Sequence, residues 1–82
     1  MTTLLPNILV QFEDDEDGRR RVWSPDVPGF LLSHRDHDAV LADIAPALET
    51  ILGERLGATV RVLPLQQRES NTQREYVVEL MP

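Results

Sequence analysis

The segment from His34 to Asp38 brings together the side chains that proteins most often use for zinc binding and proton transfer. Its sequence is His-Arg-Asp-His-Asp, so two histidines stand three positions apart and each has an aspartate nearby. However, the segment lies at a predicted junction between a strand and a helix, and Asp36 is a good helix N-cap. We therefore interpret both histidines as surface loop residues. A metal or enzymatic site built from His34, Asp36, His37 and Asp38 remains as an alternative hypothesis.

A second candidate is the acidic run Glu13 to Asp17, whose carboxylates could bind a divalent cation. The Asp-x-Asp-x-Asp-Gly spacing and the distal glutamate of an EF-hand are missing, so we interpret the run as a solvated turn. Ser24 and Ser33 lack the Gly-x-Ser-x-Gly context of a serine nucleophile. No catalytic residue, metal or other cofactor is predicted, and the chain is predicted not to be an enzyme.

Charge and composition limit the classes of partner. The 82 residues are predicted to form one domain over residues 1–82, and they carry fourteen acids against eight arginines, for a net charge of −6. This balance argues against nucleic-acid binding, which needs clustered cations, and suits a basic protein partner. The chain has no cysteine and no apolar window near the ~20 residues of a membrane span, so a cytoplasmic location without membrane contact is expected. A chain this short buries little surface, so self-association is also expected.

Hydrophobic periodicity predicts the elements that would position these residues. An amphipathic helix begins near His37, crosses Pro46 with a kink and ends near Arg55, before Gly57. The Asp17-Gly18 pair predicts a hairpin turn between the first two strands. The predicted strands are Leu4–Phe12, Arg19–Ser24, Phe30–His34, Thr59–Gln67 and Arg74–Leu80, with Glu69–Thr72 between the last two. The predicted fold is α+β, in the order β-β-β-α-β-β, with one helix packed on one face of an antiparallel sheet.

The stretch from Trp23 to Phe30 is predicted to be a rigid corner between two strands. Pro25 and Pro28 fix φ, and Gly29 is free to take the conformation that turns the chain. Asp26 is predicted to accept hydrogen bonds from local backbone amides in an Asx-turn.

Aromatic and acidic residues near this corner form a candidate partner interface. Trp23 and Phe30 are bulky residues beside a tight turn, where an interface anchor and a core position are both open. The candidate interface residues are Trp23, Phe30, Asp14, Asp15 and Glu16.

The corner Ser24-Pro25-Asp26-Val27-Pro28-Gly29 resembles the Phe-Pro-Asp-Leu-Pro-Gly motif of HicB-like antitoxin domains. In that family the motif follows an Asp-Gly hairpin, here Asp17-Gly18. It precedes a short strand, an aspartate that starts a helix, here Asp36, and an amphipathic helix. These parts occur in the same order from about Ile8 to Leu56.

The resemblance implies a truncated ribonuclease-H-like fold without catalytic carboxylates, which binds and neutralises a small basic ribonuclease toxin. The sequence departs from the family at Ser24, where the motif has an aromatic residue, and near Asp38, where the helix lacks an early leucine. A predicted C-terminal β-hairpin also replaces the family's DNA-binding module, so direct DNA binding is not expected. The leading hypothesis is a self-associating, protein-binding domain of HicB type. The alternative is a homo-oligomeric module with no toxin partner.

Overall fold

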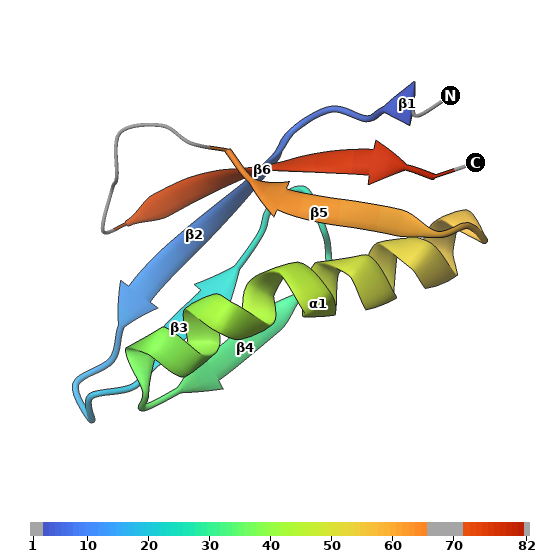
Figure 1. Ribbon diagram of the computed structural model, residues 1–82. Coiled ribbons are helices and arrows are strands. Elements are labelled where there is room, and N and C mark those ends of the chain that lie inside the picture. The colour runs from blue at the N-terminus through green and yellow to red at the C-terminus, as the bar shows by residue number, and fades with distance from the viewer. Residues whose placement is uncertain (1–2, 66–71, 82) are drawn as a thin grey trace.

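Figure 1 shows a computed structural model in which one long helix lies across one face of an antiparallel sheet. The structure describes residues 3–65 and 72–81, and these form six strands and one helix. The predicted α+β class is therefore confirmed. The elements are β1 (Thr3–Leu4), β2 (Ile8–Asp14), β3 (Arg20–Trp23), β4 (Leu31–His34), α1 (His37–Leu56), β5 (Val60–Pro64) and β6 (Gln73–Leu80).

Strand β6 lies inside the sheet, with β5 along one side and both β1 and β2 along the other. The sheet continues from β2 to β3 and then to β4, so β5 and β4 are its two longer outer strands, and the two-residue β1 pairs with β6 alone. The predicted strand Leu4–Phe12 is divided into β1 and β2. Pro6 and Asn7 together stand opposite the single residue Val77, because Leu5 bonds to Val78 and Ile8 pairs with Tyr76. The extra residue forms a β-bulge. Pro6 was the only indication of this bulge in the sequence.

Helix α1 begins and ends where the sequence predicts. The Asp36 carboxylate accepts hydrogen bonds from the amides of Asp38 and Ala39, and Gly57 ends the helix in the left-handed conformation at φ 62°. Pro46 does not divide the helix, which is continuous from His37 to Leu56.

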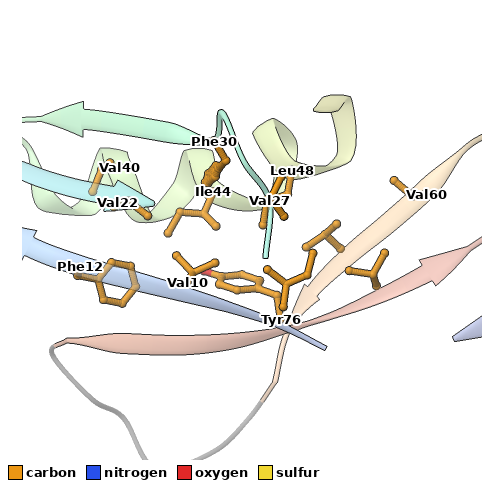
Figure 2. Close-up of a cluster of buried hydrophobic side chains, with 13 residues drawn as sticks. Val10, Phe12, Val22, Val27, Phe30, Val40, Ile44, Leu48, Val60 and Tyr76 are labelled. Carbon is orange, nitrogen blue, oxygen red and sulfur yellow. The ribbon is translucent and has the colours of Figure 1, made fainter. Parts of the chain in front are cut away.

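The hydrophobic core lies between α1 and the sheet, as Figure 2 shows. Tyr76 and Phe30 are 2% and 3% exposed, so both aromatic residues belong to the core. The buried residues are Ile8, Val10, Phe12, Val22, Val27, Phe30, Val40, Ile44, Leu48, Val60, Val62, Tyr76 and Val78.

The two C-terminal strands pair with each other, as predicted. Strand β5 runs from Val60 to Pro64, so Thr59 and Leu65 of the predicted strand lie just outside it, and its last two predicted residues, Gln66 and Gln67, lie outside the described residues. The same holds for residues 69–71 of the predicted loop. Among residues 3–65 and 72–81, no helix is long and apolar enough to cross a membrane.

Candidate protein-binding face

The sheet has a second face, which no described element covers (Figure 1). Residues that stand opposite each other on antiparallel strands project to the same side of a sheet, so the pairing register assigns each residue to a face. We call the side away from α1 the open face. It carries Leu4, Leu9, Gln11, Glu13, Arg21, Trp23, Leu31, Ser33, Arg61, Leu63, Gln73, Glu75, Val77 and Glu79.

Large apolar side chains are concentrated on the open face. Among the described residues, Leu4, Leu31 and Leu63 are 67%, 63% and 37% exposed, and all three lie there. Leu9, Trp23 and Val77 are half-buried on the same face. Three of the four exposed large apolar residues among the described ones therefore lie on this face, on three different strands, and we take the face as the candidate site.

Charged side chains separate the apolar residues of the open face. Three acids, Glu13, Glu75 and Glu79, stand against two arginines, Arg21 and Arg61. Arg21 contacts Glu13 at 3.4 Å between Nη2 and Oε2. The face is therefore mixed in character, with one more acid than arginine.

The corner from Trp23 to Phe30 is docked on β2 through side chains. Ser24 Oγ donates to the Leu9 carbonyl at 2.6 Å, and the Leu9 amide donates to Asp26 Oδ2 at 2.9 Å. The Asp26 amide donates in turn to Ser24 Oγ at 3.2 Å. The predicted role of Asp26 in a local Asx-turn is wrong, because its carboxylate binds an amide seventeen residues away.

These bonds take the place of one backbone hydrogen-bonded pair between β2 and the chain that follows β3. Strand β3 ends at Trp23, opposite Gln11, and the next residue to bond to Leu9 in that register is Pro25. Proline has no N–H to donate, so Ser24 supplies the donor and Asp26 supplies the acceptor. Ser24 is 5% exposed, which explains why this position holds a small polar residue.

The end of the corner is fixed by Gly29 and by α1. Gly29 has φ 88°, a conformation that residues with a Cβ rarely adopt, and this confirms its predicted role. The Arg55 guanidinium donates to the Pro28 carbonyl, which ties the corner to the last turn of the helix. Of the two predicted interface aromatics, Phe30 is buried in the core, whereas Trp23 lies on the open face beside Leu31.

The acidic hairpin predicted at Asp14, Asp15 and Glu16 is a solvent-facing turn. Asp14 Oδ1 contacts Arg20 Nε at 2.8 Å, and Asp15 Oδ1 contacts Arg21 Nε at 3.0 Å. The hydrogen bond with Arg20 lowers the pKa of Asp14, and the same bond raises the pKa of Arg20. These pairs hold two of the three predicted residues, and Glu16 is exposed at the tip.

The histidine and aspartate cluster is used in local structure. His34 Nδ1 accepts from the Asp36 amide at 2.9 Å, and the Asp36 carboxylate caps α1. His37 Nε2 lies 4.0 Å from Asp14 Oδ1. Within residues 3–65 and 72–81, no group of three or more potential ligand side chains is placed to hold a metal ion. The bonds of this cluster are therefore those of a strand-to-helix connection.

A shallow depression lies at the end of β4 and is lined by Arg19, Ser33, His34 and Arg35.

Among the described residues, Tyr76 is the one core residue with a shifted pKa. Burial raises the pKa of Tyr76, so its hydroxyl stays neutral in the core.

Sequence periodicity did not identify most of the open face. Leu9, Leu63 and Val77 alternate with core residues, but each strand has apolar residues on both faces, so its sequence does not tell which face the helix covers. The one indication in the sequence was that these strands are apolar on both faces, a pattern that is also typical of a strand buried on both sides.

In comparisons with protein-family models, curated proteins and solved structures, nothing matches this chain.

Proposed function

We propose that this chain is a HicB-like protein-binding domain, whose open face binds a small basic protein such as a ribonuclease toxin. The observation that carries the proposal is the concentration of Leu4, Leu31, Leu63 and the half-buried Trp23 on the uncovered side of the sheet. The net charge of −6 supports it as well, because charge complementarity speeds the encounter with a basic partner.

The HicB assignment rests on the corner motif and on the order of the elements around it. A helix on one side of an antiparallel sheet is the arrangement that the resemblance implies, so the fold supports a truncated ribonuclease-H-like relationship. The docking of Ser24 and Asp26 on β2 gives the motif a structural role. A structural role of this kind would explain why protein-binding domains of the family carry the motif.

A pull-down from the native host, followed by mass spectrometry, tests the proposal. We expect recovery of a small basic protein that co-elutes with the chain in size-exclusion chromatography after co-expression. The recovery of no such protein, or a failure of the two to co-elute, contradicts the proposal.

A pair of leucine variants then locates the binding surface. Leu63 lies on the open face and Leu56 lies on α1, and they are 37% and 49% exposed. Leu63→Lys places a positive charge where the basic partner should bind, so we expect binding to fall at least tenfold, whereas Leu56→Lys should leave it unchanged. Equal effects of the two substitutions would remove the open face from the proposal.

A further inference from the structure

The two outer strands of the sheet differ in what their free edges contact. Along an antiparallel ladder, alternate residues direct their N–H and C=O groups to one side. Arg19 O accepts from Asp15 N, so the odd-numbered residues of β3 bond to β2 and the even-numbered residues bond to β4. In β4, Leu32 and His34 therefore bond to β3, and Leu31 and Ser33 direct their backbone groups outward.

The outward edge of β5 is blocked at two positions. Leu65 donates to Glu75 on β6, so the even-numbered residues of β5 point away from β6. The Val62 amide donates to Glu49 Oε2 at 2.9 Å, and Pro64 has no N–H. A side chain from the helix and a proline thus protect this edge from pairing with another strand.

The edge of β4 has no such protection within the described part of the chain. No described side chain bonds to the backbone of Leu31 or Ser33, and Figure 1 shows no described segment beyond β4 on its outer side. Next to this edge, Leu31 is 63% exposed and stands opposite the half-buried Trp23. An unprotected strand beside exposed apolar surface is a template for pairing with another strand.

We infer that β4 is a homodimer interface, in which the β4 strands of two copies pair antiparallel about a twofold axis. The strand is its own complement, because each outward residue offers one donor and one acceptor, as an isologous interface requires. In the register that places Leu31 opposite Ser33 of the other copy, both outward residues of each strand are paired. That register uses strand residues alone, whereas the adjacent ones need Gly29, at φ 88°, or Arg35, where the chain turns toward the helix.

The local charge favours a second copy over the basic partner proposed above. Leu31, Leu32 and Ser33 are uncharged, while Arg19, His34 and Arg35 surround the depression at the end of the strand. The paired edge itself carries no acid to attract a basic protein, whereas an uncharged strand can pair with an identical strand without like-charge repulsion. Antiparallel pairing places the two His34–Arg35 ends at opposite ends of the interface, where they do not face each other.

The dimer is tested with the chain alone, so the result does not depend on the proposed partner. Sedimentation velocity of the wild type over a wide concentration range should show a monomer–dimer equilibrium. Leu31→Lys should shift the dissociation constant at least tenfold toward monomer. Leu63→Lys is the matched control, because Leu63 is also an exposed leucine of an outer strand, and it should leave the equilibrium unchanged. A wild type that is monomeric at every concentration, or equal effects of the two substitutions, overturns the inference.

Two further variants test the strand pairing itself. Ser33→Pro removes an outward amide that β3 does not use, so it should abolish the dimer while the protein stays folded by circular dichroism. Because the chain has no cysteine, Leu31→Cys and Ser33→Cys protein can be mixed and oxidised, and the mixture should give a cross-linked dimer. Cross-linking of Leu63→Cys protein to itself, with none between Leu31→Cys and Ser33→Cys, would place the interface on β5 and overturn the inference.

Discussion

The two outer strands, β5 and β4, end the same sheet in different ways. The β5 edge is blocked at Val62 by Glu49 from α1 and at Pro64, whereas β4 leaves the outward groups of Leu31 and Ser33 without a described side-chain partner. A third position, at Leu9 on β2, is closed by Ser24 and Asp26 where β3 ends. Sheet edges are sites of aggregation unless they are blocked, so an edge left open beside two blocked positions is a candidate for specific pairing.

The side chains that block edge positions in this chain come from residues distant in sequence. Glu49 is thirteen positions from Val62, and Asp26 is seventeen positions from Leu9. Both acceptors are carboxylates on segments that have another reason to be where they are, namely a packed helix and a rigid corner. The blocked edges are thus part of the tertiary structure, and their loss should appear as a loss of folding stability. Changes to the outward edge of β4 should instead weaken the association of two copies.

The largest effect on stability is expected at the corner that leads into β4. Gly29→Val forces a β-branched residue to φ 88° and brings its Cβ to 3.3 Å from the Arg55 guanidinium. The strained backbone alone costs on the order of 1–3 kcal/mol, and the contact with Arg55 adds to it. Gly18→Val is the matched control, because Gly18 has φ 87° and nothing within 4 Å of an added Cβ. Thermal unfolding should show the larger loss for Gly29→Val; equal melting temperatures would mean that the corner is not held by α1.

The next effect tests the closed position on β2. Ser24→Ala removes the donor to the Leu9 carbonyl and the acceptor for the Asp26 amide at a site that is 5% exposed. Leaving such groups unsatisfied should lower the free energy of unfolding by about 1–2 kcal/mol. Ser33→Ala, on the open edge, is the control and should change stability by less than about 0.5 kcal/mol. Denaturant unfolding measures both, and a larger loss at Ser33 would reverse the assignment of closed and open positions.

Glu49 tests the closed outer strand with a smaller expected change. Glu49→Ala leaves the Val62 amide without its acceptor and should destabilise the protein by about 1 kcal/mol. Glu49→Gln keeps an acceptor oxygen and should lose less than the alanine variant, and Glu54→Ala provides an exposed helix control. A glutamine variant as unstable as the alanine variant would show that the carboxylate acts through its charge and not as an edge cap.

The elements themselves were predictable from the sequence because their signals are local. Asp36 and Gly57 marked the ends of the helix, Asp17-Gly18 marked the hairpin turn, and Gly29 marked the end of the corner. Each depends on a backbone preference that acts within a few residues. The division of the first strand could not be located, because the bulge is defined by what stands opposite Pro6 and Asn7 on a strand about seventy residues later.

The open face was less predictable, because it consists of the residues that α1 does not cover when it packs on the sheet. The predicted interface included Trp23, which lies on the open face, and Phe30, which lies in the core. The two aromatics flank the same corner, and only the direction of the chain through Val27 and Gly29 places one inside and one outside. The role of Asp26 was missed for a similar reason, since nothing near it in sequence reveals that Leu9 lacks a backbone partner on that side.

The smallest effect is expected at Asp14, which tests whether hairpin charges matter as much as closed edges. The hydrogen bond from Arg20 lowers the pKa of Asp14 from its ordinary value of 3.8, so the folded state favours the ionised carboxylate. The resulting stabilisation is present above that value and is lost as the pH falls through the lower pKa of the folded protein.

Asp14→Asn should therefore lower the melting temperature slightly at neutral pH, and the difference from the wild type should shrink as the pH falls below 3.8. Because Asp14 faces solvent, water screens the pair, and the loss should be smaller than that of Ser24→Ala. Thermal unfolding over a pH series measures both quantities. A loss as large as that of Ser24→Ala, or one that persists at low pH, would show that the hairpin ion pairs hold β2 and β3 together and that backbone closure by side chains is secondary.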